Sequence, residues 1–148
     1  MTSFVEIYDL AMLTITDYRL DALAKKDEQA FKNYLRGKLT SGVSEFTGCL
    51  TSLDTTVVDG EYYFVNDLSS KEKSIIAKTV VYKWFLQLHQ DVVALRPHLT
   101  VKEFKQTDVN NGIKQRSEYL DKLKEDIHFD ITQYQLENLS RLTYFGGK

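Results

Sequence analysis

Histidines and acidic residues are the side chains of this chain that could perform metal or acid–base chemistry. His89, Asp91 and His98 could approach one another as ligands of a metal-dependent hydrolase, while His128 is far away in the sequence. Zinc enzymes place two histidines four residues apart on one helix face, as in His-Glu-x-x-His, and the chain has no such pair. Cys49 is the only cysteine, so a paired-thiol metal site is absent. The sequence therefore predicts no cofactor and no enzyme, and the metal-dependent hydrolase is an alternative.

Phosphate chemistry is also disfavoured by the sequence. The seven glycines never form a glycine-rich loop between a strand and a helix, which nucleotide-binding proteins need to hold phosphate groups. The formal net charge of −2 lacks the overall basicity of a sequence-independent nucleic-acid binder. A local basic side remains, because Lys71, Lys73 and Lys78 fall in one predicted helix. These lysines are candidates for a DNA-channel or interface contact, and the alternative is a solvated helix face.

Two aromatic clusters are the best candidates for protein contacts. Tyr62, Tyr63 and Phe64 form the first cluster, and Tyr144 and Phe145 form the second. Both lie outside the apolar stripes of the predicted helices, and tyrosine and phenylalanine are enriched at protein interfaces. The alternative is that these aromatics cover the ends of a helical bundle.

The elements that position these residues are predicted to be mostly helical. A capping box at Ser3 and Glu6 opens a helix over about 3–17, and a long apolar stripe covers 27–53, with a kink or break near Ser41-Gly42. The Asp59-Gly60 pair between β-branched and aromatic residues predicts a hairpin at about 56–65.

A second capping box, at Ser69 and Glu72, predicts a helix to about Val93. Pro97 ends it, and Thr100-x-x-Glu103 predicts a short helical turn. The last helix is expected over about 110–138, followed by a mobile C-terminal tail at about 140–148. The fold class is thus mostly α, a bundle of about four helices with a small β-hairpin.

Length and composition agree with one domain over 1–148. A chain of 148 residues with a single proline favours long uninterrupted helices. The first 20 residues do not read as a signal peptide, and no apolar run reaches the roughly 20 residues that a membrane span requires. We therefore expect synthesis in the cytoplasm and no membrane contact.

Several phrases of the sequence resemble a family of tailed-bacteriophage neck proteins, the head-completion or head–tail connector proteins. In the N-terminal half they are IYDLA at 7–11, ITDYRLD at 15–21, EFTGCL at 45–50, LSSKEK at 68–73 and KW at 83–84. In the C-terminal half they are HL at 98–99, FK at 104–105, KQRSEYLDKL at 114–123 and DITQYQL at 130–136. One departure is Asn110-Asn111-Gly112, which weakens the start of the last helix relative to the family.

The resemblance implies a structural virion protein located in the phage neck. Such a subunit forms a homo-oligomeric ring, a dodecamer by resemblance, below the portal protein and joins the head to the tail. Its other partner would be a tail-side neck or tail-terminator protein, and packaged DNA would pass through without sequence readout. A cytoplasmic helical adapter or regulator that binds a single partner is the alternative. The family brings no catalytic residues to this chain.

Overall fold

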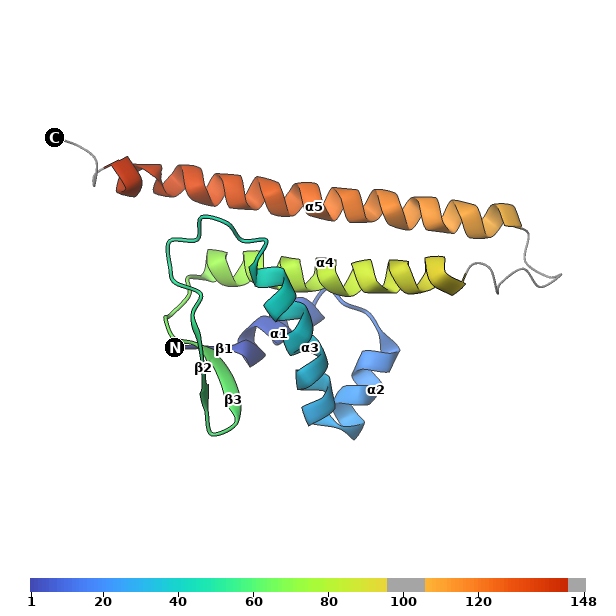
Figure 1. Ribbon diagram of the computed structural model, residues 1–148, viewed down its shortest axis with the longest axis horizontal. Helices are drawn as coiled ribbons and strands as arrows, with labels where there is room; N and C mark the ends of the chain where they lie inside the picture. The colour runs from blue at the N-terminus through green and yellow to red at the C-terminus, as the bar shows by residue number, and fades with distance from the viewer. Residues whose placement is uncertain (96–105, 144–148) are drawn as a thin grey trace.

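The computed structural model describes residues 1–95 and 106–143 of the chain (Figure 1). It confirms the mostly helical fold class with a small antiparallel sheet. The predicted turn at Thr100 to Glu103, His98, and the aromatic pair Tyr144 and Phe145 lie outside the described residues. No described helix has both the length and the apolar character needed to cross a bilayer.

The N-terminal segment folds into two helices where the sequence predicted one over 3–17. Helix α1 spans Phe4–Met12 and begins with the predicted capping box, in which the Ser3 hydroxyl accepts from the Val5 amide and Glu6 accepts from the Ser3 amide. Helix α2 spans Tyr18–Lys26. It starts separately because the side chain of Asp17 accepts a hydrogen bond from the Arg19 amide and caps a new helix.

Helix α3 spans Glu28–Val43, and the predicted helical stripe to residue 53 is wrong beyond this point. The expected break near Ser41-Gly42 is therefore the end of the helix. Gly42 lies against Thr79 of α4, where a Cβ would come within 2.6 Å of the threonine hydroxyl. Residues 44–54 form an irregular loop, in which Gly48 adopts a φ of +72° that no right-handed helix contains.

A three-stranded antiparallel sheet replaces the predicted two-stranded hairpin. Strands β2 (Thr55–Val58) and β3 (Glu61–Phe64) form the expected hairpin, with Asp59 and Gly60 both at positive φ as a tight two-residue turn requires. Strand β1 (Thr2–Ser3) pairs with the other side of β3, so the strand order is β1-β3-β2.

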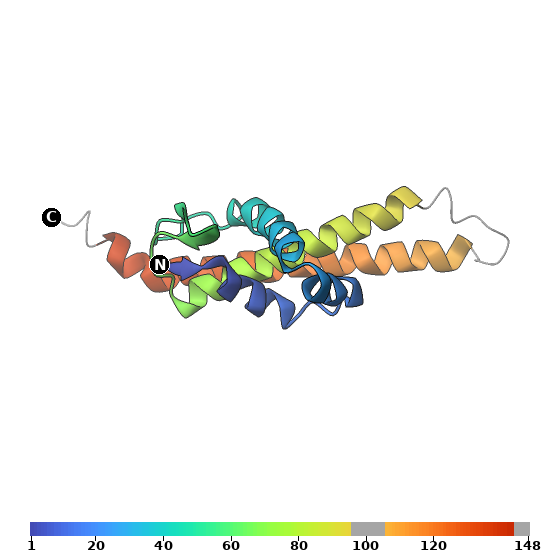
Figure 2. The ribbon, with the colours of Figure 1, turned by 90° about the horizontal axis from the view of Figure 1, so that it is seen from below.

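Two long helices run along the long axis of the molecule (Figure 1). Helix α4 spans Ser70–Leu95 and helix α5 spans Gln106–Thr143, so they are about 39 Å and 57 Å long. The last helix is longer at both ends than the predicted 110–138, and its final turn includes residues assigned to the tail. Helices α1 and α3 lie against α4 on the side opposite α5, and α2 packs on α3. The C-terminal end of α4 and the N-terminal end of α5 project beyond them (Figures 1 and 2).

The hydrophobic core lies where α1, α3, β3 and α5 meet the first half of α4. Its fully buried members include Ile7, Leu35, Leu39, Phe64, Ile75, Ile76 and Val80. The second half of α4 is different, because every residue from 82 to 89 remains partly exposed.

Candidate interaction surfaces

One residue of the first predicted aromatic cluster lies in the core, and the other two are half-buried. Phe64 has a relative exposure of 0%, so the prediction of Phe64 as a contact residue is corrected: its ring packs 4.8 Å from that of Phe4. Tyr62 is half-buried, stacked on Phe4 and covered by the Arg36 guanidinium at 4.3 Å from the ring centre. Tyr63 lies on the other face of β3 and is also half-buried. The physical reason is the position of β3, which is the central strand of the sheet and packs on α1.

The exposed apolar residues of the sheet are instead on β2 and just after β3. Val57, Val58 and Val65 are exposed. The sequence could have indicated the exposure of Val57 and Val58, because they lie in an outer strand of the predicted hairpin. An edge strand has a neighbouring strand on one side only.

The predicted basic side of α4 is neutralised by carboxylates of neighbouring helices. The Lys71 ammonium lies 2.7 Å from Glu137, and that of Lys73 lies 2.6 Å from Glu6. Lys78 pairs with Asp130 of α5. These lysines therefore link α4 to α5 and α1, and their charges are balanced locally, which lowers their attraction for phosphate.

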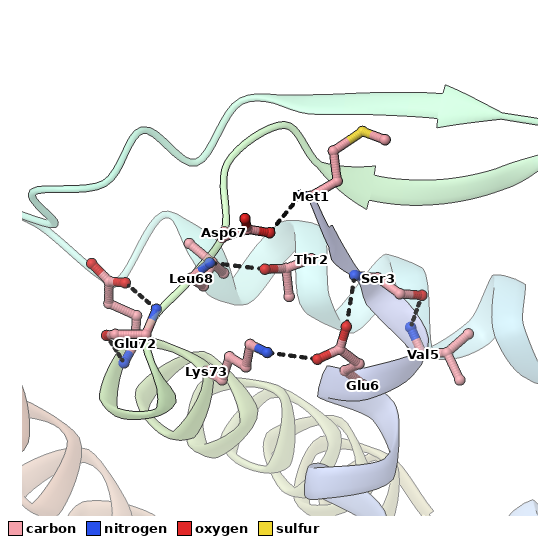
Figure 3. A network of polar contacts seen from close by, with 10 residues as sticks. Met1, Thr2, Ser3, Val5, Glu6, Asp67, Leu68, Glu72 and Lys73 are labelled. Atoms are coloured by element: carbon pink, nitrogen blue, oxygen red, sulfur yellow. Dashed lines mark hydrogen bonds and ion pairs between the residues drawn. The ribbon is translucent and has the colours of Figure 1, made fainter.

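The N-terminal segment is held by polar contacts to the loop before α4 (Figure 3). The Met1 amino group lies 2.5 Å from a carboxylate oxygen of Asp67, and the buried Thr2 hydroxyl accepts a hydrogen bond from the Leu68 amide at 2.8 Å. The ion pair of Lys73 with Glu6 joins the first turns of α4 and α1. These contacts fix β1 against the start of α4 and so complete the sheet.

A buried carboxylate connects α4, α5 and the 44–54 loop. Glu72 has a relative exposure of 3% and accepts hydrogen bonds from Tyr134 (2.6 Å), Thr51 (2.7 Å) and the Ser69 amide (2.7 Å). The Ser69 hydroxyl accepts from the Glu72 amide, which completes the second predicted capping box. The local spacing of Ser69 and Glu72 predicted this cap. The hydrogen bond from Tyr134 has no local signal in the sequence, because Tyr134 is 62 residues away in the chain.

The ionisation states of this cluster indicate a structural role. Burial alone would raise the pKa of Glu72, but the hydrogen bonds from Tyr134, Ser69 and Thr51 outweigh it and lower the pKa to about 2. Burial, followed by the neighbouring Glu72 charge, raises the pKa of the Cys49 thiol to about 11, so the thiol is protonated and unreactive at neutral pH. The cluster thus holds helices together and contains no activated nucleophile.

The two described histidines lie on different helices, His89 on α4 and His128 on α5. His89 is half-buried on α4, its buried Nδ1 has no hydrogen-bond partner in the described part of the chain, and Asp91 is exposed. His128 is exposed on α5. Within residues 1–95 and 106–143, no three His, Cys, Asp or Glu side chains are arranged to hold a metal ion.

An apolar groove lies where the C-terminal half of α1 meets α4 and α5. Its volume is about 220 Å³. The apolar lining residues are Leu10, Ala77, Val81, Leu123 and Ile127, and the polar ones are Thr14, Ser74, Lys78 and Asp126. Leu13, which directly precedes the groove-lining Thr14, and Tyr18, the first residue of α2, are 81% and 90% exposed, the highest values among the exposed large apolar residues of the described chain. We call Leu13 and Tyr18 the apolar corner.

The projecting half of α4 has a wider apolar surface than one partner helix covers. At about 100° per residue, its apolar side chains spread over about 200° of the helix circumference. These side chains are Tyr82, Trp84, Phe85, Leu86, Leu88, Val92 and Val93. Contact with one neighbouring helix buries a stripe of about 100°, and α5 provides such a contact through Tyr119 and Phe85, whose ring centres are 4.8 Å apart. Helix α3 covers a second side, where Tyr82 and Trp84 pack against the core and the Lys38 ammonium donates to Gln87. The apolar surface that stays available to another molecule therefore consists of partly exposed side chains and the exposed Val93.

Comparison of the chain with protein-family models, with curated proteins and with solved structures gives no match.

Proposed function

We propose that this protein is a head-completion or head–tail connector subunit of a tailed bacteriophage, located in the neck of the virion. The observation that carries the proposal is the projecting pair of helices, α4 after residue 82 and the facing part of α5, with its partly uncovered apolar surface. A long, rigid helix pair of this kind offers a lateral wall to neighbouring copies. The resemblance of the sequence to neck proteins supports the same conclusion.

Ring assembly explains why this surface is left uncovered in one chain. Two unlike sides of a subunit must meet for a ring to close by rotation. The half-exposed residues from Tyr82 to His89 would be one side of such a contact, and burial of apolar surface at roughly 25 cal/mol per Å² would stabilise it. The proposed assembly is a homo-oligomeric ring, a dodecamer by resemblance.

The charge arrangement fits a channel wall that DNA passes. A subunit around translocating DNA must not bind phosphate tightly, and Lys71, Lys73 and Lys78 are each paired with a carboxylate. The proposed partners are the portal protein above the ring and a neck or tail-terminator protein below it. Packaged DNA would pass through the ring without sequence readout.

Mass spectrometry of purified phage particles tests the proposal. A connector must be present in the particle in an amount comparable to the portal protein, and it must remain after washing at high salt. Its absence from particles, together with capture of one host or phage protein from infected cells, would replace the proposal with a cytoplasmic adapter.

Metal content separates the proposal from a metal-dependent hydrolase that uses His89, Asp91 and His98. The purified full chain should contain no stoichiometric metal by plasma mass spectrometry. Stoichiometric zinc or manganese that is lost in the His89→Ala variant would contradict a purely structural role.

A further inference from the structure

The groove between α1, α4 and α5 has the size of a site for protein side chains. Small-molecule pockets usually measure about 300–1,000 Å³, whereas this groove measures about 220 Å³. Leu10, Val81 and Ile127 give it an apolar lining, so water in it is weakly held. A leucine or an aromatic ring presented by another protein surface would fill it.

The apolar corner of the chain itself supplies side chains of this kind. Leu13 and Tyr18 are almost fully exposed, so both side chains are available to enter a groove on another molecule. Neither enters the groove of its own chain, although the groove-lining Thr14 follows Leu13 directly. Every copy therefore carries both an unfilled groove and side chains that fit it.

Charges beside the two surfaces are complementary. Arg19 follows Tyr18 and is exposed, and Asp126 is exposed at the groove. In the described part of the chain, the Arg19 guanidinium and the Asp126 carboxylate have no ion-pair partner within 4.0 Å. A second copy that inserts its corner into the groove brings an arginine toward an aspartate.

We propose that two copies of this chain form a two-fold symmetric dimer in which the Leu13 and Tyr18 corner of each copy occupies the groove between α1, α4 and α5 of the other. The symmetry follows from position, because Leu13 directly precedes the groove-lining Thr14, so one contact can use both surfaces of each copy. An isologous contact of this kind closes after two copies and cannot extend into a chain. The inference does not depend on a place in the virion.

The dimer also has a consequence for assembly. It covers a large share of the exposed apolar surface near α1 while leaving the projecting ends of α4 and α5 accessible. A free subunit held in closed pairs would be protected from non-specific association before it meets its partner.

Sedimentation equilibrium of the full chain, supported by native mass spectrometry, tests the dimer. We expect a monomer–dimer equilibrium, and at least about tenfold weaker association for Leu13→Ser/Tyr18→Ser. The matched control is Val57→Ser/Val58→Ser, which removes two exposed apolar side chains from β2 and should leave association unchanged. A monomer at all concentrations up to about 1 mM, or equal effects of both variants, would overturn the proposal.

A charge exchange tests the orientation independently of folding. Arg19→Glu and Asp126→Arg should each weaken the dimer, and the double variant should restore it, because the two charges then attract across the interface again. Circular dichroism confirms that each variant keeps its helices. A dimer that persists in both single variants, or a double variant weaker than either, would place the contact elsewhere and overturn the proposal. Absence of the protein from phage particles would contradict the proposed function and leave this result unaffected.

Discussion

The hydroxyl of Tyr134 on α5 donates a 2.6 Å hydrogen bond to the buried carboxylate of Glu72 on α4. The same hydroxyl accepts a hydrogen bond from the Leu50 amide at 3.1 Å, so one side chain joins both long helices to the 44–54 loop. The Tyr134 ring also contacts Phe46 edge-to-face at 5.2 Å. Together with the ion pairs of Lys71 and Lys78, this contact holds the C-terminal half of α5 against the body.

Removal of the Tyr134 hydroxyl should destabilise the fold. The variant Tyr134→Phe leaves the Leu50 amide without its partner and takes one donor from a carboxylate that is 3% exposed. We expect a loss of about 1–3 kcal/mol in the free energy of unfolding, measured by urea denaturation. Tyr119→Phe on the same helix is the control, because its ring contact with Phe85 is retained. Equal stabilities of the two variants would contradict the role of the Tyr134 hydroxyl.

Acid should destabilise the protein through Glu72. Its pKa in the folded chain is about 2, below the ordinary value of 4.5. A lowered folded-state pKa contributes stability that is fully present above about pH 4.5 and is lost as the pH falls toward 2. The contribution is on the order of 2–3 kcal/mol, and unfolding measured from pH 7 to pH 2 should show its loss.

The variant Glu72→Gln separates this effect from other carboxylates. It should be less stable than the parent at pH 7, and the difference should shrink below about pH 4. The stability of the variant should still fall in acid, but by less. Glu6 and Glu45 cause this remainder, because hydrogen bonds to Lys73 and Lys83 lower their pKa values. Glu125→Gln, at an exposed position of α5, should follow the parent at every pH. A stability difference that stays constant with pH would show that Glu72 acts by shape alone.

Local signals in the sequence predicted most of the elements. Both capping boxes, the Asp59-Gly60 turn and the apolar seam of the last helix depend on residues within a few positions of one another, and the structure contains all four. The end of α3 was harder to predict, because the apolar stripe continues past Val43. Phe46 keeps the helical spacing but reaches the core from a loop, where tertiary packing overrides the periodic pattern.

The candidate surfaces could be predicted only in part, since exposure depends on contacts between distant segments. Phe64 was an interface candidate by residue type. It lies in the core because β3 also pairs with β1, where Phe64 is opposite Thr2, 62 positions earlier in the chain. Leu13 lay in a predicted helix and Tyr18 in a resemblance phrase, so neither was a contact candidate, and both are exposed where the chain passes from α1 to α2. The carboxylates that neutralise Lys71 and Lys78 lie on α5, more than 50 residues away.

Two glycines of α3 should respond to alanine in opposite directions. At Gly42 a Cβ would come within 2.6 Å of the Thr79 hydroxyl and 3.2 Å of its backbone carbon, so Gly42→Ala should cost about 1–3 kcal/mol. At Gly37 no heavy atom lies within 4 Å, and Gly37→Ala should stabilise the helix by about 0.4–1 kcal/mol. Thermal unfolding of the two variants checks both signs. Equal shifts would show that α3 and α4 are not packed as closely as the glycine implies.

Neutralising the carboxylates that pair with the lysines of α4 should create affinity for DNA. The triple variant Glu6→Gln/Asp130→Asn/Glu137→Gln frees Lys73, Lys78 and Lys71, while glutamine at position 6 can keep the capping box. Three freed lysines should tighten binding to a random-sequence duplex and steepen the logarithmic salt dependence by up to about 3, measured by fluorescence anisotropy.

The control Asp9→Asn/Asp21→Asn/Glu125→Gln makes the same change in net charge at exposed positions on other surfaces. If the control binds DNA as tightly as the triple variant, net charge alone governs binding and the ion pairs do not mask the lysines. Tighter binding by the triple variant alone would show that local pairing, rather than the overall charge of −2, keeps this surface from holding DNA.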